Sequence, residues 1–181
     1  YNIVYRDIKP ENLMISREGH LKVVDFGFAK IVPDRTFSVC GTPEFLAPEI
    51  IQREGHGTAA DWWSFGVLLY ELVIGMPAFF DESPMKIYQK ILNHTRFFFP
   101  PTRVDQALRD VINGLCVQNP ADRLTGAMLK RMPLFADIDW LAVACERLSP
   151  PWIPNLTSET DTSYFEDYPD LTKENSGGPF D

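Results

Sequence analysis

The chain has 181 residues, of which 45% are hydrophobic and 13% aromatic, so it is long and apolar enough to bury a core. Its net charge of -8 argues against nucleic acids and anionic membranes as partners and leaves basic peptides as candidates. The most apolar run, residues 62–76, is too short to span a bilayer and contains Glu71, so we expect no transmembrane segment.

The cysteines indicate the redox environment. Cys40, Cys116 and Cys145 are widely spaced and odd in number, which favours free thiols over a disulfide framework. We therefore expect a cytoplasmic protein. The chain begins with Tyr1 and shows no signal peptide, so we interpret it as an internal piece of a longer soluble protein.

The first predicted element is a small β-hairpin. Residues 13–16 and 21–24 are short apolar runs, and Gly19 between them can adopt the positive φ of a tight turn. From residue 25 to about residue 57 no periodicity persists, and prolines and glycines interrupt any helix. This stretch is predicted to be a long loop region.

Four helices are expected after residue 57. Thr58 with Asp61 three residues later has the spacing of a capping box, and the helix that follows is hydrophobic on nearly all sides, as in a buried central helix. Ser83 and Pro84 are suited to begin a second, amphipathic helix. The third helix has its apolar face formed by Leu108, Val111, Ile112 and Leu115. A fourth helix is expected around residues 140–148.

The last 33 residues differ in composition from the rest. From Ser149 the chain is rich in Pro, Ser, Thr, Asp and Glu and loses helical periodicity, which predicts a tail over residues 149–181. Large apolar groups at intervals suggest that this tail docks along a surface, with a disordered acidic linker as the alternative. These groups are Trp152, Tyr164, Phe165, Tyr168 and Phe180.

Three motifs carry the chemistry. The segment Y-R-D-I-K-P-E-N occupies residues 5–12, D-F-G occupies 25–27 and A-P-E occupies 47–49. The predicted hairpin would bring the first two together. Phosphoryl transfer needs cations, oxygen ligands for a metal ion and a group that positions the attacking hydroxyl, and these motifs contain all three. One tripeptide is weak evidence, but three motifs in this order and spacing are specific.

On these motifs the chain resembles the AGC group of serine/threonine protein kinases. The longer matching stretches are DFGFAK, CGTPEFLAPEI, ADWWSFGVLLYE and DTSYFEDY. Within that group the chain is most similar to the cyclic-nucleotide-dependent kinases, of the cyclic-AMP or the cyclic-GMP type. The resemblance extends from Tyr5 to about Tyr168. Tyr5 replaces the usual histidine, and Ser38 stands where these relatives normally carry threonine.

The resemblance implies a fold and a domain organisation. The fold would be mainly α with a small β-hairpin near the N-terminus, a kinase C-terminal lobe with the N-terminal lobe missing. Residues 1–148 would be the C-lobe part of the catalytic domain, with the catalytic loop at 5–12 and the activation segment at 25–49. Residues 149–181 would be the AGC C-terminal tail.

The resemblance also implies ATP and Mg²⁺ as cofactors and assigns catalytic roles. Asp7 would orient or accept the proton of the substrate hydroxyl, and Lys9 would stabilise the transferred phosphate. Asn12 and Asp25 would hold magnesium. Without such neighbours, Asp7 would be an ordinary turn residue and Lys9 a solvated surface charge.

An activation switch is implied around Ser38. This serine aligns with the activation-loop phosphosite, and Arg6 is suited to pair with a phosphate there, added by an activating kinase or by autophosphorylation. An unmodified loop serine is the alternative. Thr42 would bond to Asp7 and Lys9 and favour Ser/Thr over Tyr as the acceptor. Cys40 beside it is either redox-sensitive or a buried inert thiol.

Substrate recognition would rest on acidic and apolar residues. Glu11 and Glu71 match positions that bind an arginine upstream of the acceptor; the alternatives are a solvated Glu11 and a partner for Glu71 inside the fold. The apolar pocket for the residue after the acceptor would be formed by Val39, Pro43 and Leu46. The implied regulatory partner is a cyclic-nucleotide-binding domain or subunit.

Further residues would support the site. Asp61 can both cap its own helix and bind backbone amides of the catalytic loop. Glu49 and Arg123 would form a buried ion pair. Phe165 and Tyr168 would close over the nucleotide.

The rest of an ATP site is missing from the sequence. There is no G-x-G-x-x-G loop and no V-A-I-K lysine. We therefore expect the 181 residues alone to lack kinase activity and the longer protein to phosphorylate Ser/Thr in basic, Arg-containing peptides. The alternatives are a pseudokinase or scaffold that uses this lobe as an interaction platform, and a truncated regulatory decoy.

Overall fold

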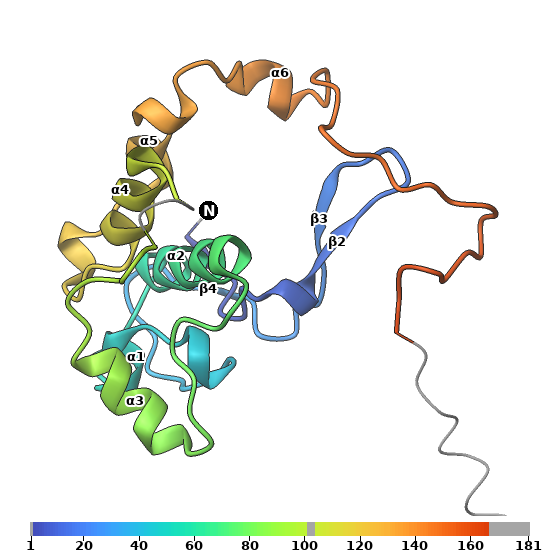
Figure 1. Cartoon of the computed structure of the whole chain (residues 1–181). Coiled ribbons are helices and arrows are strands. Elements are labelled where there is room, and N and C mark those ends of the chain that lie inside the picture. Colours follow the sequence, from blue (N-terminus) through green and yellow to red (C-terminus); the bar gives the residue numbers. More distant parts are fainter. Residues whose placement is uncertain (1, 101–103, 167–181) are drawn as a thin grey trace, which may run out of the picture.

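The computed structural model describes residues 2–100 and 104–166 and is mostly helical, with two antiparallel pairs of short strands (Figure 1). The helices are α1 (Pro48–Ile51), α2 (Ala59–Ile74), α3 (Pro84–Leu92), α4 (Gln106–Leu115), α5 (Gly126–Leu129) and α6 (Trp140–Ala144). The strands are β1 (Ile3–Val4), β2 (Leu13–Ile15), β3 (Leu21–Val23) and β4 (Lys30–Ile31). Single 3₁₀ turns are η1 (Pro10–Asn12), η2 (Pro43–Phe45), η3 (Pro120–Asp122) and η4 (Pro133–Phe135). The predicted fold class, mainly α with a small hairpin near the N-terminus, is confirmed.

Helix α2 lies at the centre of the helical part and packs against α4 and η2 (Figure 1). Trp63, Val67 and Leu68 of α2 are fully or almost fully buried, as expected for a helix that is hydrophobic on nearly all sides. Gly66 lets α4 come close, because a Cβ at this position would lie 2.6 Å from the Sγ atom of Cys116. The core therefore forms around α2 and fixes the position of the side chains at its ends, such as Asp61 in the first turn.

The start of α2 differs from the prediction. Thr58 has helical dihedral angles, φ -59° and ψ -22°, and its side chain makes no capping hydrogen bond. The capping-box prediction is therefore wrong. The carboxylate of Asp61 accepts hydrogen bonds from the backbone of Tyr5 and Arg6 instead, so it serves the catalytic loop. The helix ends where Gly75 adopts a left-handed conformation, φ 80°.

Helices α3 and α4 pack as their sequences predict. Helix α3 also begins after Ser83, although the Ser83 side chain makes no capping hydrogen bond. Pro84 occupies the first turn of α3, and Ile87 and Ile91 face the core. In α4, Asp105 caps the N-terminus by accepting a 2.6 Å hydrogen bond from the amide of Ala107. Helix α6 ends at Ala144 rather than near residue 148.

Both strand pairs are antiparallel. The predicted hairpin is present, with Leu13 opposite Val23 and Ile15 opposite Leu21, and Gly19 has a φ of 89° in its turn. The second pair was not predicted, since β1 and β4 have only two residues each and show no alternation; Val4 lies opposite Lys30. This pair joins the start of the catalytic loop to the activation segment.

The segment after α6 runs past the tip of the β2–β3 hairpin (Figure 1). A Cβ on Gly19 would lie 2.4 Å from the carbonyl oxygen of Trp152, which shows how closely the two backbones approach. Arg17 donates a 3.3 Å hydrogen bond to the carbonyl oxygen of Ser158. Residues 149–166 thus contact the hairpin surface, whereas Tyr168 and Phe180 lie outside the described residues.

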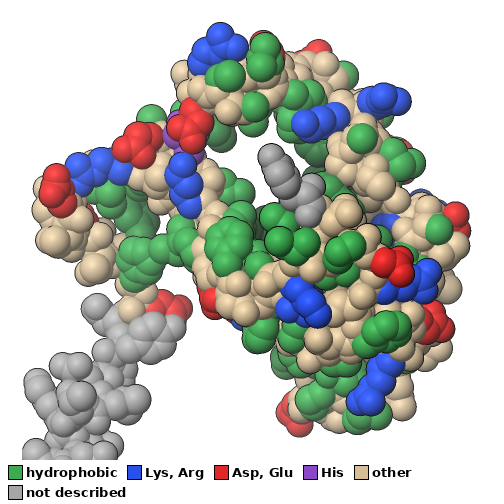
Figure 2. All heavy atoms as spheres, turned by 180° about the vertical axis from the view of Figure 1, so that it is seen from behind, with side chains coloured by type: hydrophobic (Ala, Val, Ile, Leu, Met, Phe, Trp, Pro, Cys, Tyr) green, Lys and Arg blue, Asp and Glu red, His purple; other side chains and the backbone are tan. Residues whose placement is uncertain are grey.

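The lengths of the helices and the apolar side chains on the surface bear on membrane crossing and on apolar binding. Across the described parts of the chain, 2–100 and 104–166, no helix combines the length and the apolarity that crossing a membrane requires. Figure 2 shows hydrophobic side chains around the hollow between the hairpin and the helices. An apolar cavity of about 360 Å³ is lined by Tyr5, Ile8, Leu13, Leu21, Val23, Phe26, Phe65 and Leu68.

Candidate active site

The catalytic loop is held by the N-terminal turn of α2. The carboxylate of Asp61 accepts hydrogen bonds from the amide of Tyr5 at 2.7 Å and from the amide of Arg6 at 2.8 Å. Arg6 has a φ of 71°, a left-handed conformation that is uncommon for a residue with a side chain. Burial raises the pKa of Asp61, while the two amide bonds and the charge of Arg6 oppose that shift. The loop therefore keeps a strained conformation because a buried carboxylate fixes two consecutive amides.

Asp7 is the centre of a small polar cluster. Its side chain is almost completely buried, and the amide nitrogen of Asn12 donates to its Oδ2 atom at 2.9 Å. The ammonium group of Lys9 lies 3.0 Å from the same oxygen. The turn η1 creates this arrangement, because it folds the chain back so that positions 7, 9 and 12 meet. The sequence prediction placed these three residues together, and the structure does so.

Thr42 closes the cluster from the activation segment. Its hydroxyl donates to Oδ1 of Asp7 at 3.1 Å and accepts from Nζ of Lys9 at 3.1 Å. Both oxygens of Asp7 are therefore held by donors from two different segments. A carboxylate fixed in this way can orient a hydroxyl group and accept its proton.

Asp25 stands next to this cluster but is exposed. It has a φ of 56°, and its Oδ1 accepts a 3.1 Å hydrogen bond from the amide of Gly27. The preceding residue, Val24, donates from its amide to the carbonyl oxygen of Asn12 at 3.0 Å, which places the D-F-G segment beside η1. Tyr5 senses both acids: burial raises its pKa, and the charges of Asp7 and Asp25 raise it further.

The donor set suits magnesium. Asn12 donates through its amide nitrogen to Asp7, so its oxygen is the atom it can offer to a cation, and Asp25 adds a carboxylate. Mg²⁺ commonly uses one or two carboxylates and completes its shell with phosphate and water. The part of the chain that the structure describes contains no group of three His, Cys, Asp or Glu side chains arranged for a metal.

The activation segment presents Ser38 to solvent. Arg6, its proposed partner, donates from Nε to the carbonyl oxygen of Phe28 at 2.6 Å, while its Nη1 atom is buried without a partner among the described residues. Nearby, Lys30 donates from Nζ to the hydroxyl of Thr36 at 3.1 Å. Cationic groups therefore gather beneath the loop that carries Ser38.

Three glutamates form an acidic surface. Glu71 on α2 is partly buried, and its pKa is raised by burial and then by the charges of Glu11 and Glu44. The sequence analysis identified Glu11 and Glu71 but missed Glu44, although its position directly after Thr42 and Pro43 was an available signal. The three carboxylates are near enough to interact and are suited to a basic ligand.

The residues predicted for the apolar pocket have different surroundings. Leu46 is buried in the core, with 5% of its surface exposed, whereas Val39 is 51% exposed. Pro43 begins η2 between them and is partly buried. The proposed pocket would therefore have to form from Val39 and Pro43 at the surface, with Leu46 supporting η2 from below.

Glu49 and Arg123 form the predicted ion pair. Nη1 of Arg123 lies 2.8 Å from Oε1 of Glu49, and Nη2 lies 3.0 Å from Oε2. Arg123 also donates to the carbonyl oxygen of Ala59 at 2.7 Å, and its guanidinium group lies 5.3 Å from the centre of the Trp63 ring. The pair thus joins α1 to the start of α2 and to the segment after η3.

The tail contributes to a cavity beside the hairpin. Phe165, Trp152 and Tyr164 line a space of about 310 Å³ together with Met14 and its neighbours on β2. Tyr168, the other predicted tail residue, lies outside the described residues.

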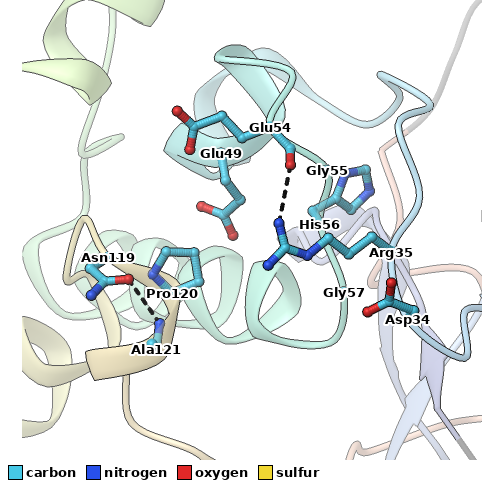
Figure 3. A pocket seen from close by; sticks show the side chains of 10 residues that line it. All are labelled: Asp34, Arg35, Glu49, Glu54, Gly55, His56, Gly57, Asn119, Pro120 and Ala121. Atoms are coloured by element: carbon cyan, nitrogen blue, oxygen red, sulfur yellow. Dashed lines mark hydrogen bonds between the residues drawn. The ribbon is translucent and has the colours of Figure 1, made fainter.

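A separate cavity of about 290 Å³ lies behind the activation segment and was not predicted (Figure 3). Glu49 points into it, and Arg35 donates a 3.5 Å hydrogen bond to the carbonyl oxygen of Glu54. The imidazole of His56 lies at the end of the cavity away from Asn119. His56 could not be identified from the sequence, because a single histidine in a loop forms no pattern.

Comparison with known proteins identifies the family. The protein kinase domain matches residues 1–135 of the chain. The chain belongs to the protein kinase family. It is 48% identical to the cAMP-dependent protein kinase catalytic subunit PRKX of Homo sapiens over 173 residues. The matched region covers 93% of this chain and 48% of the relative. It is 47% identical to the cAMP-dependent protein kinase catalytic subunit 3 of Drosophila melanogaster over 93% of this chain and 29% of the relative.

A third similar kinase is the cAMP-dependent protein kinase catalytic subunit of Dictyostelium discoideum, 47% identical over 92% of this chain and 26% of the relative. The resemblance to AGC kinases of the cyclic-nucleotide-dependent type is thereby confirmed. The chain spans about half the length, or less, of these kinases.

Proposed function

We propose that the protein containing this chain transfers the γ-phosphoryl group of ATP to serine or threonine hydroxyls of basic peptides. The observation that carries the proposal is the buried carboxylate of Asp7, held by Asn12, Lys9 and Thr42 at 2.9 to 3.1 Å. A carboxylate held in one orientation by several donors, with a lysine beside it, is what phosphoryl transfer to an alcohol requires.

Each residue has a distinct task in this proposal. Asp7 orients the acceptor hydroxyl and takes its proton, and Lys9 faces the negative charge of the transferred group. Asn12 and Asp25 would hold Mg²⁺, whose chemistry is to neutralise the charge on the phosphates. Thr42 fixes the carboxylate of Asp7 and the ammonium group of Lys9 relative to each other, since its hydroxyl bonds to both.

Substrate class and regulation are argued from the acidic surface and the relatives. The mutual repulsion of Glu11, Glu44 and Glu71 favours binding of an arginine side chain. The names of the similar kinases favour the cyclic-AMP type over the cyclic-GMP type, and with it a regulatory subunit as partner. Phosphorylation of Ser38 would activate the protein. Cys40, Cys116 and Cys145 are free thiols, which suits the cytoplasm.

The 181 residues hold only part of the ATP site. They contain no glycine-rich phosphate loop of the kinase type and no V-A-I-K lysine, and the relatives are at least about twice as long. We propose that this chain alone does not turn over. A binding module without catalysis is the alternative, but the intact set of Asp7, Lys9, Asn12 and Asp25 disfavours it.

The test uses the longer protein with Mg²⁺, ATP and a serine peptide that carries upstream arginines. We expect Asp7→Asn to lower kcat by about 10²- to 10⁴-fold with little change in ATP binding. The matched control is Asp34→Asn, an exposed acid of the activation segment, which should leave kcat unchanged. Normal turnover by Asp7→Asn would refute the assignment. Magnesium-dependent turnover by the 181 residues alone would refute the half-site proposal.

A further inference from the structure

Two buried nitrogen atoms beneath the activation segment lack a hydrogen-bond partner among the described residues. They are Nη1 of Arg6 and Nε2 of His56. Buried polar groups are nearly always paired, so two orphaned nitrogens in one region indicate a missing acceptor. The pocket behind the segment is lined by the acids Asp34, Glu49 and Glu54. Glu49 is bound at both oxygens by Arg123, and among the described residues none of the three bonds to either nitrogen.

The backbone places His56 beside the segment that carries Ser38. His56 is 4% exposed and forms an antiparallel bridge with Thr36, each amide donating to the other's carbonyl oxygen at 2.9 Å. Residues opposite one another in an antiparallel pair have their side chains on the same face. The hydroxyl of Thr36 accepts from Lys30, so Lys30, Thr36 and His56 share that face.

The neighbouring residues show which way Ser38 faces. Phe37 packs on the opposite face, because a Cβ on Gly55 would lie 2.8 Å from an atom of its ring. Alternation of side chains beyond the bridge at Thr36 would return Ser38 to the face of Thr36 and His56. Ser38 is exposed and therefore accessible to a modifying enzyme.

Charges of both signs surround His56, because the acids Asp34, Glu49 and Glu54 line the same cavity. Burial lowers its pKa, and the charges of Arg6 and, more weakly, Lys30 lower it further, whereas Glu49 raises it. These three residues come from the catalytic loop, β4 and α1. Arg35, in the same region, donates to the backbone of Glu54. Of the charged groups that shift the pKa of His56, the two cations oppose protonation and the one acid, Glu49, is engaged by Arg123.

We propose that His56 is the third arm of an anion site formed with Arg6 and Lys30, and that it binds the phosphate of phosphorylated Ser38 as an imidazolium. The phosphate would draw one proton from solvent onto His56, and no other bond would form or break. Activation-loop phosphorylation and proton uptake are then linked, so each strengthens the other. The inference rests on the proposed function only in assigning the phosphate to Ser38.

The test is a histidine titration by NMR on the full chain, prepared once with serine and once with phosphoserine at position 38. The sequence has only three histidines, so His20 and His94 serve as internal controls. We expect phosphoserine to raise the titration midpoint of His56 by about 1 to 3 pH units and to leave the other two unchanged. Phosphoserine at position 158, in the exposed tail, controls for added charge and should have no effect on His56.

Phosphorus NMR provides an independent measurement. The second ionisation of phosphoserine at position 38 should lie below its ordinary value near pH 6, and His56→Phe should return it toward that value. An unchanged midpoint of His56 after phosphorylation would overturn the proposal. A response of His56 to inorganic phosphate but not to phosphoserine would overturn the assignment to Ser38. Neither measurement uses ATP, so a kinase without activity could still pass this test, and an active kinase could fail it.

Discussion

Arg123 grips Glu49 through two parallel hydrogen bonds, 2.8 and 3.0 Å long, in a site where both side chains are at most 4% exposed. The guanidinium also holds the first carbonyl group of α2, at Ala59. The pair therefore stabilises the junction at which the activation segment meets the central helix, and Asp61 in the same first turn of α2 holds the catalytic loop. Order in the loop depends on order in this junction.

We expect Arg123→Met to destabilise the chain by about 3 to 5 kcal/mol, because it leaves the buried Glu49 carboxylate without a partner. The double variant Arg123→Met with Glu49→Leu should recover most of that loss, since it removes both charges. Urea unfolding of the two variants measures the difference. Arg131→Met is the control, because Arg131 is an exposed cation of the same residue type. Equal stability of the single and double variants would contradict a penalty from the unpaired charge.

His94 predicts an acid-sensitive stability. Its ring lies in an aromatic cluster, with centroids 4.2 Å from Phe97 and 5.3 Å from Phe79, and burial lowers its pKa from 6.5 to about 4. A histidine with a lowered pKa in the folded state favours folding when neutral. That contribution is complete above about pH 6.5 and is lost as the pH falls toward 4.

We therefore expect roughly 2 to 3 kcal/mol of acid destabilisation from His94 between about pH 7 and about pH 4.5. His94→Phe should remove this part of the pH dependence, and His20→Gln should leave it in place. Urea unfolding at a series of pH values gives the slopes. Identical slopes for His94→Phe and the parent chain would show that the imidazole protonates freely in the folded state.

The elements predicted correctly are those in which the sequence pattern and the burial agree. Helix α2 is apolar on nearly all sides and lies at the centre, and Ile87 and Ile91 of α3 recur at helical spacing and face the core. The hairpin had its glycine at the turn. Periodicity records burial, and burial dominates the stability of these elements.

The missed features depend on contacts between distant segments. Strands β1 and β4 have two residues each, so no alternation could reveal them. Thr58 and Asp61 have capping-box spacing, but the carboxylate of Asp61 accepts hydrogen bonds from the backbone amides of Tyr5 and Arg6 instead. Within the site, motif spacing placed Asp7, Lys9 and Asn12 together, whereas Glu44 and His56 have meaning only through partners far away in the sequence.

Glu71 is expected to govern recognition of basic peptides by the longer protein. Because Glu11 and Glu44 already raise its pKa, an arginine bound among the three relieves repulsion as well as forming a charged hydrogen bond. Glu71→Gln should raise KM for an arginine-containing peptide by about 10- to 100-fold and leave kcat nearly unchanged. Glu54→Gln is the matched control outside this surface. An equal effect of Glu71→Gln on a peptide without arginine would refute the specific role.

The close approach of α2 and α4 makes a last prediction at Gly66. An alanine Cβ there would lie 2.6 Å from Sγ of Cys116 and 2.7 Å from Cβ of Leu115, so the helices must separate. We expect Gly66→Ala to destabilise the chain by about 1 to 3 kcal/mol, despite the better helix propensity of alanine.

Gly75→Ala separates packing from backbone effects. Its Cβ would meet nothing within 4 Å, and only the left-handed φ of 80° would oppose it, at about 1 kcal/mol. Adding Cys116→Ala to Gly66→Ala should restore part of the lost stability, since the contact with Leu115 remains, whereas adding it to Gly75→Ala should restore none. Thermal unfolding of the variants measures these differences. A Gly66→Ala chain as stable as the parent would mean that α2 and α4 can move apart without loss of packing.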